Sequence, residues 1–177
     1  MATQPALTRF VTVEEYLTTV YEPDCEYDDG EAVERNLGEF DHSFMQAMLT
    51  TIFTVNMDSW GVYGLPEQRV QIKARRFLIP DVCVLPIGYK REPILTRPPL
   101  IAIEIMSPED RKKAVAAKSV EYLDFGVEHV WVIDPASRKA FLATRSGLQN
   151  VPSGILTVPG TPILVQASEL FARLDRM

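Results

Sequence analysis

The sequence predicts one domain of the α/β (α+β) class, and two observations lead to that prediction. Residues 77–86 and 98–108 are apolar on both faces when read with the period of two of a β-strand, which is typical of strands covered on both sides. Residues 41–57 and 109–125 instead carry apolar side chains at helical spacing. Because 177 residues can bury one substantial core, we expect a single domain spanning residues 1–177.

Composition excludes several classes of protein. Hydrophobic residues make up 46% of the chain and charged residues 24%, as is ordinary for a globular protein. No apolar stretch approaches the ~20 residues of a membrane-spanning helix, and residues 1–10 lack the apolar core of a signal peptide, so we expect a cytoplasmic protein without a membrane partner. The net charge of −6 argues against tight non-specific binding along nucleic acid but leaves room for a local basic patch. Cys25 and Cys83 are too few and too far apart to predict a disulfide framework or a zinc site.

The first 40 residues are expected to contain a short helix and a hairpin. Thr12 and Glu15 form a capping-box pattern, which predicts a helix over about residues 13–20. Asp29 and Gly30 separate two short alternating segments, and this dipeptide favours a tight turn because glycine tolerates positive φ. The N-terminal region should therefore begin with a helix that leads into a β-hairpin.

Three candidate site residues belong to this region and to the helix that follows. Glu26 and Asp28 lie on the hairpin, where either acid could approach a metal ion, although turn-flanking acids are commonly solvated. Residues 41–57 predict a helix with a wide buried face, and His42 lies near its beginning. A histidine in the first turn either faces a ligand or is exposed to solvent, and the sequence leaves both alternatives open.

Two acids interrupt the strongest apolar segments of the chain. Residues 60–86 contain short strand-like segments separated by turn residues, and we expect an antiparallel meander that ends in the strand of Asp81. Pro80 removes a backbone donor, which predicts a strand end or a bulge at the point where Asp81 is presented. Glu104 lies within the second apolar run, at 98–108. Two buried carboxylates are costly and repel each other, and a divalent metal ion would resolve both problems.

A helix over residues 109–125 follows the second apolar run. Pro108 is a typical residue at a helix start, and Gly126 is a natural helix stop. Lys118 falls at the edge of the apolar arc of this helix, so its ammonium group either extends to water or points inward. The remaining chain is expected to contain a buried strand at 127–135 closed by an Asp134-Pro135 turn, a hairpin partner at 138–148 and a short amphipathic helix at 168–174. Asp134 either caps the backbone of this turn or takes part in catalysis.

Asp81, Glu104 and Lys118 would together suit hydrolysis of a phosphodiester bond. Carboxylate ligands favour Mg²⁺ or Mn²⁺, which can activate a bound water and stabilise charge on phosphoryl oxygens. The lysine can position the water or neutralise the transition state. A pair of acids can also serve a glycosidase, but few aromatic residues flank this pair and a lysine has no evident role in that mechanism.

The order of these motifs resembles the Uma-two family of predicted endonucleases, which belongs to the restriction endonuclease-like, or PD-(D/E)XK, superfamily. The resemblance begins at TVEEYL, continues through YDDGE and PDVCVL to EIMSPED, and includes KSVEYLDFGVEHVWVIDP, so it covers most of the chain. It implies a restriction endonuclease-like core, with a mixed central sheet flanked by helices. It also implies a Mg²⁺-dependent (or Mn²⁺-dependent) endonuclease that acts on DNA. Because many members of the superfamily form dimers, we expect a homodimer.

The resemblance assigns roles to individual residues. It implies a divalent metal ion held by Asp81, Glu104 and the backbone carbonyl of Ile105. The superfamily's lysine normally stands two residues after the second acid, a position occupied here by Met106. In relatives that lack this lysine, one from the next helix is thought to substitute, and Lys118 is the matching residue.

Further residues match the family pattern or depart from it. The spacing of Lys118 to Tyr122 is similar to the Gln-x-x-x-Tyr motif of related nucleases. Glu26 corresponds to the acid of the YDDGE-like segment, and His42 corresponds loosely to a helix histidine or acid in some branches. An acid often precedes the lysine by four residues, where this chain has Ala114.

Met106, Ala114 and the acidic charge leave a second hypothesis open. It is a catalytically weak or inactive nuclease-fold scaffold that binds a protein or nucleic-acid partner.

Overall fold

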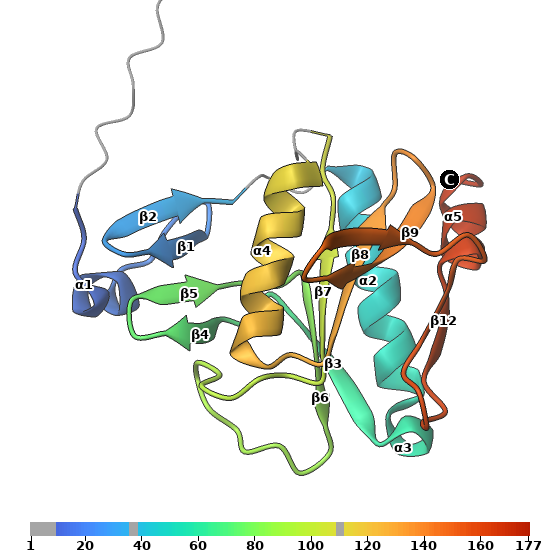
Figure 1. Cartoon of the computed structure of the whole chain (residues 1–177), viewed down its shortest axis with the longest axis horizontal. Coiled ribbons are helices and arrows are strands. Elements are labelled where there is room, and N and C mark those ends of the chain that lie inside the picture. The colour runs from blue at the N-terminus through green and yellow to red at the C-terminus, as the bar shows by residue number, and fades with distance from the viewer. Residues whose placement is uncertain (1–9, 36–38, 109–111) are drawn as a thin grey trace, which may run out of the picture.

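The computed structural model describes residues 10–35, 39–108 and 112–177, and these residues form two main sheets with helices packed around them (Figure 1). The larger sheet has six strands, in the spatial order β10 (Gly147–Asn150), β9 (Lys139–Thr144), β8 (His129–Asp134), β7 (Ile101–Ile105), β6 (Val82–Pro86) and β3 (Val62–Pro66). The smaller sheet has four, in the order β2 (Glu31–Glu34), β1 (Cys25–Asp28), β5 (Arg76–Leu78) and β4 (Val70–Lys73). The other described elements are α1 (Val13–Thr18), α2 (Phe40–Val55), α3 (Met57–Trp60), α4 (Lys112–Phe125), α5 (Ala167–Leu174) and the hairpin of β11 (Ile155–Thr157) with β12 (Leu164–Gln166).

The larger sheet is mixed, because β6 and β7 pair antiparallel whereas β7 and β8 pair parallel. The parallel pair requires a crossover, and α4 supplies it. In Figure 1, α4 lies on one side of this sheet and α2 on the other. The predicted α/β (α+β) fold class, with a mixed central sheet flanked by helices, is therefore confirmed.

Each face of the larger sheet has its own apolar core, because successive side chains of a strand point to opposite faces. On one face, Val82, Val84, Ile101 and Ile103 pack with the buried side of α2 and with α5. The opposite face includes Cys83, Leu85, Ala102 and Val130, which pack with Tyr122 of α4. Asp81 and Glu104 have the same parity as the residues of this second face.

The predicted meander over residues 60–86 is wrong. β3 pairs with β6 of the larger sheet, whereas β4 pairs with β5 of the smaller sheet. The predicted strand end or bulge at Asp81 is a break between two strands, since β5 ends at Leu78 and β6 begins at Val82. Pro80 lies in the break, as its missing N–H predicted. Periodicity shows which residues share a face, but it does not show which strand becomes the partner.

Other local predictions hold. The Thr12 hydroxyl accepts a 3.1 Å hydrogen bond from the Glu15 amide at the start of α1, and the helix ends at Thr18, two residues before the predicted end. The turn between β1 and β2 has Gly30 at φ 110°, in the region that favours glycine. Residues 109–111, where the helix of Lys118 was predicted to begin, lie outside the described residues. Among the described residues, no helix is long and apolar enough to cross a membrane.

Candidate active site

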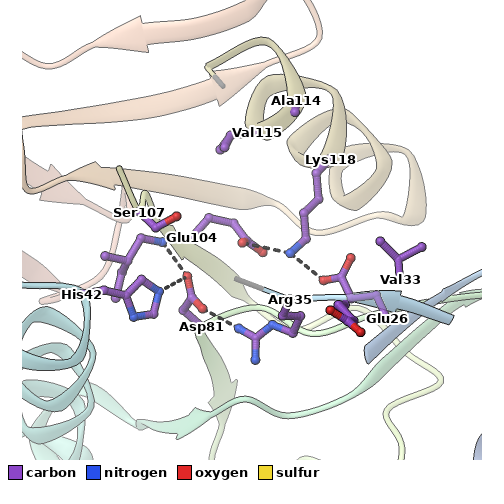
Figure 2. Close-up of a pocket in the computed structure, with 12 residues that line it drawn as sticks. Glu26, Val33, Arg35, His42, Asp81, Glu104, Ser107, Ala114, Val115 and Lys118 are labelled. Atoms are coloured by element: carbon purple, nitrogen blue, oxygen red, sulfur yellow. Dashed lines mark hydrogen bonds and ion pairs between the residues drawn. The ribbon is translucent and has the colours of Figure 1, made fainter. Parts of the chain in front are cut away.

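The pairing of β6 with β7 brings the two acids together. Val82 lies opposite Ile103 in this antiparallel pair, so the same register places Asp81, one residue before β6, opposite Glu104. Both side chains are buried, with 3% of Asp81 and 8% of Glu104 exposed. Figure 2 shows the two carboxylates in one pocket, with Lys118 reaching down from α4.

Three groups hold the Asp81 carboxylate. Its Oδ2 accepts a 2.7 Å hydrogen bond from the Ile105 amide and lies 3.3 Å from His42 Nε2, while Oδ1 accepts a 2.6 Å hydrogen bond from Arg35 Nη2. Burial alone would raise the pKa of Asp81. The hydrogen bond from His42 and the charges of His42, Arg35 and Lys118 outweigh burial and hold the pKa below its usual value. Asp81 is therefore an ionised carboxylate.

Glu104 lies in a different electrostatic environment. Its Oε2 is 3.0 Å from Lys118 Nζ, and its Oε1 accepts a 2.7 Å hydrogen bond from the Tyr122 hydroxyl. Burial raises its pKa to about 7, with Asp81 and Glu26 contributing in the same direction and Lys118 opposing them. The positive charge around Glu104 is thus too small to offset the cost of burying its carboxylate. A bound cation would supply the missing charge.

Lys118 bridges two acids. Its Nζ lies 2.6 Å from Glu26 Oε1 and 3.0 Å from Glu104 Oε2, and 20% of its side chain is exposed. Burial lowers its pKa, but the charges of Glu104 and Glu26 outweigh burial and raise the pKa above its ordinary value. The sequence left open whether this lysine reaches water or points inward, and the structure places it inward and charged.

Local sequence explains why these side chains meet. Lys118 and Tyr122 are four residues apart on α4 and so project from the same side of the helix toward Glu104. Glu26 lies on β1, and its Oε1 also accepts a 3.1 Å hydrogen bond from the Ile79 amide. The hairpin predicted from Asp29 and Gly30 therefore carries its acid to the break between the two sheets.

Together these residues form a pocket of about 280 Å³. Of the candidates named from the sequence, six line the pocket. Tyr122 lies behind Glu104, and Asp28 instead lies 3.7 Å from Arg76 Nη1, with 58% of its side chain exposed. Sequence reasoning missed Arg35, because an arginine after a hairpin carries no pattern that predicts an active-site contact. The lining residues are Glu26, Val33, Glu34, Arg35, His42, Asp81, Glu104, Ile105, Ser107, Ala114, Val115 and Lys118.

The two departures from the family pattern lie in different surroundings. Met106 is buried in an apolar cluster with Val115, Val132 and Phe141. Ala114 lines the pocket one helical turn before Lys118. Met106, at the position of the superfamily's usual lysine, therefore has apolar surroundings. Ala114, at the position of the usual acid, faces the pocket.

The donor set fits a hard divalent cation. Asp81, just before β6, and Glu104, on β7, offer neighbouring carboxylate oxygens, and the pKa of Glu104 indicates a deficit of positive charge. In the part of the chain that the structure describes, no group of three or more His, Cys, Asp and Glu side chains is arranged to hold a metal ion. A cation here would have few side-chain ligands and would retain water, as Mg²⁺ commonly does.

The chain matches the model of a known protein family. A family model described as "Uma2: Putative restriction endonuclease" matches residues 13–170. The chain belongs to the Uma2 family. The resemblance inferred from the sequence motifs is thereby confirmed. Membership of Uma2 makes this chain a member of a restriction endonuclease-like nuclease family, and that superfamily generally uses divalent metal ions.

A solved crystal structure shares the fold of this chain. The crystal structure of a "putative nuclease belonging to DUF820" from Anabaena variabilis ATCC 29413 has a TM-score of 0.79 and 21% sequence identity, covering 93% of this chain and 99% of that one. A cryoEM structure of a DrdV–DNA complex shares 15% identity over 60% of this chain and 10% of its own, with a TM-score of 0.43. A search of curated protein sequences found no match. The first likeness supports the fold alone.

Proposed function

We propose that this Uma2 protein is a divalent-metal-dependent endonuclease that hydrolyses phosphodiester bonds in DNA. The observation that carries the proposal is the meeting of Asp81, Glu104 and Lys118 in one pocket at the break between two sheets. A nuclease needs charge neutralisation at the phosphate and a means of activating water. Lys118 can supply positive charge, and the two carboxylates can hold a cation that serves both needs. A second copy would supply a second pocket for the opposite strand, so the proposal includes a homodimer.

Asp81, Glu104 and the backbone carbonyl of Ile105 would hold the cation. When bound, Mg²⁺ or Mn²⁺ supplies Lewis-acid stabilisation of the phosphoryl oxygens and lowers the pKa of a coordinated water. The protein orients the ligands beforehand, because the Ile105 amide holds Asp81 Oδ2 and the Tyr122 hydroxyl holds Glu104 Oε1. Ligands whose orientation is set by other hydrogen bonds bind metal with less reorganisation.

Lys118 acts in the proposal as a charged group rather than as a base. Glu26 and Glu104 keep its ammonium protonated, so Nζ donates hydrogen bonds and contributes positive charge beside the reacting phosphate. His42 has a different task. Burial lowers the pKa of His42, but the hydrogen bond and charge of Asp81 outweigh burial and raise it, so His42 helps to keep Asp81 ionised.

Cleavage of supercoiled plasmid in Mg²⁺ or Mn²⁺ tests the proposal. We expect the wild-type protein to nick or linearise the plasmid and Asp81→Ala to abolish the reaction, because the substitution removes a ligand. Asp124→Ala is the matched control, since Asp124 is an acid on α4 whose side chain is 57% exposed and pairs with Arg145. Equal cutting by Asp81→Ala and the wild type would mean a contaminant or a different site.

The second candidate function is a nuclease-fold scaffold without strong catalysis. It is favoured by the positive groups that already contact both carboxylates, namely Arg35 on Asp81 and Lys118 on Glu104. Calorimetric titration with Mn²⁺ separates the two candidates. A nuclease should bind Mn²⁺ in a manner lost in Glu104→Gln, whereas the same weak response from both proteins would favour the scaffold.

A further inference from the structure

The two oxygens of Asp81 are used differently. Oδ2 is close to two nitrogen groups of the protein frame, the Ile105 amide and His42 Nε2, which leaves little room for another partner. Among the described residues, Oδ1 has one protein contact, the 2.6 Å hydrogen bond from Arg35 Nη2. A metal ion bound by Asp81 would therefore take Oδ1, the oxygen that Arg35 holds in this structure.

Arg35 has a second partner nearer the solvent. Its Nη1 lies 3.1 Å from Glu67 Oε1, and the Glu67 side chain is 47% exposed whereas that of Asp81 is 4% exposed. Glu67 has a φ of 52°, in the left-handed region that is unfavourable for a residue with a side chain. Its amide donates a 3.2 Å hydrogen bond to the Asp81 carbonyl, so this strained residue is anchored beside the site.

A guanidinium group and a divalent cation cannot share Oδ1 without strong repulsion. An arginine keeps its charge under all physiological conditions, so Arg35 cannot relieve the repulsion by losing a proton. It can do so by leaving Asp81 while it keeps Glu67. The backbone of Arg35 would remain fixed, because its amide donates a 3.1 Å hydrogen bond to the Asp24 carbonyl.

We propose that Arg35 exchanges partners at this site: it neutralises Asp81 in the metal-free protein, and it moves to a phosphodiester group of the nucleic acid when a divalent cation takes Asp81. The inference rests on the proposed function, since it requires a cation on Asp81. The freed guanidinium would lie at the pocket that the phosphate must enter, and its fork of N–H groups matches phosphate oxygens. Arg35 thus competes with the metal ion for Asp81 and contacts the substrate once the metal ion is bound.

Titration of the purified metal-free protein with Mn²⁺, followed by calorimetry, tests the first step. Arg35→Gln removes the competing charge, so we expect it to bind Mn²⁺ about tenfold more tightly than the wild type. Arg75→Gln is the matched control, because it makes the same change in net charge at an exposed arginine that pairs with Asp29. Its affinity for Mn²⁺ should equal that of the wild type.

Binding of a short fluorescent DNA duplex in Ca²⁺, measured by anisotropy, tests the second step. Here Arg35→Gln should bind about tenfold more weakly than the wild type, because a charge-assisted contact to phosphate is lost. A single substitution that strengthens metal binding and weakens DNA binding cannot be explained by misfolding. Unchanged or weaker Mn²⁺ binding in Arg35→Gln overturns the exchange, as does unchanged DNA binding.

The failure of this inference differs from failure of the proposed function. If Mn²⁺ binding by the wild type depends on Glu104 while Arg35→Gln is unchanged, only the exchange is wrong. If neither the wild type nor Arg35→Gln binds Mn²⁺, the metal-dependent nuclease itself is wrong. Should Arg35→Gln lack a cooperative thermal transition, Arg35→Met replaces it, because methionine keeps a long unbranched side chain and removes the positive charge. Mn²⁺ should then bind severalfold more tightly, and equal affinity overturns the exchange.

Discussion

The Tyr122 hydroxyl donates a 2.7 Å hydrogen bond to Glu104 Oε1, at the end of the carboxylate opposite to the one that Lys118 contacts. The Tyr122 side chain, on α4, is fully buried in the apolar core between this helix and the larger sheet. Burial raises the pKa of Tyr122 well above its ordinary value, and Glu104 adds to the effect, so the hydroxyl keeps its proton and remains a donor. Tyr122 and Lys118, one turn apart on α4, thus orient Glu104 with a neutral and a charged hydrogen-bond donor.

Tyr122→Phe should therefore slow plasmid cleavage and also destabilise the protein. Losing a hydrogen bond to a buried charged group costs about 1.5–3 kcal/mol, measured by urea denaturation. Cleavage should fall about tenfold, because Glu104 loses the donor that orients it. Tyr16→Phe is the control, since the Tyr16 hydroxyl donates a similar 2.8 Å hydrogen bond to the Cys25 carbonyl, in a different core cluster. A Tyr122→Phe variant that cuts at the wild-type rate would contradict this role.

Met106→Lys, which restores the superfamily's usual lysine, should not improve the enzyme. The new ammonium group would lie among Val115, Val132 and Phe141, so we expect a loss of more than about 3 kcal/mol in unfolding free energy and no faster cleavage. Met106→Leu, which preserves volume, should cost less than about 1.5 kcal/mol. The two values can be compared by urea denaturation. A stable Met106→Lys variant with increased activity would show that this position can serve the site.

Ala114→Asp should strengthen metal binding. Ala114 lines the pocket one turn before Lys118, so an acid there adds negative charge close to Asp81 and Glu104. We expect Mn²⁺ affinity, measured by calorimetry, to rise about fivefold. Ala117→Asp is the control, because Ala117 is an exposed residue of the same helix that does not line the pocket and the change in helix propensity is the same. Equal gains in both variants would indicate a general charge effect rather than a ligand.

The pH dependence of stability should show the ionisation of Tyr16 at alkaline pH. Burial raises its pKa from 10.0 to about 12, against the opposing charge of Arg69. Between these values the unfolded chain loses the proton while the folded protein retains it, so unfolding is favoured and stability falls as pH rises from about 10 to about 12. In Tyr16→Phe this part of the slope should be absent from urea denaturation measured between neutral and alkaline pH. An unchanged slope would mean that Tyr16 ionises normally in the folded protein.

The sequence by itself determined much of the local structure and predicted which residues could form a site. The apolar runs around Asp81 and Glu104 predicted buried strands with one acid each, because side-chain alternation is a property of the strand alone. The spacing of Lys118 and Tyr122 likewise placed both on one side of a helix. The motif order was sufficient to recognise the Uma2 family, which the family comparison confirmed.

Only the tertiary structure decided which of these residues meet and what else joins them. The register of β6 and β7 sets Asp81 opposite Glu104, and the division of the chain between two sheets at Pro80 opens the pocket. The contact of Arg35 with Asp81 spans 46 residues and joins the end of the hairpin to a different sheet. Such contacts depend on which strands pair and how sheets pack. Strand pairing and sheet packing depend on the free energy of the whole core, so local periodicity in the sequence does not predict them.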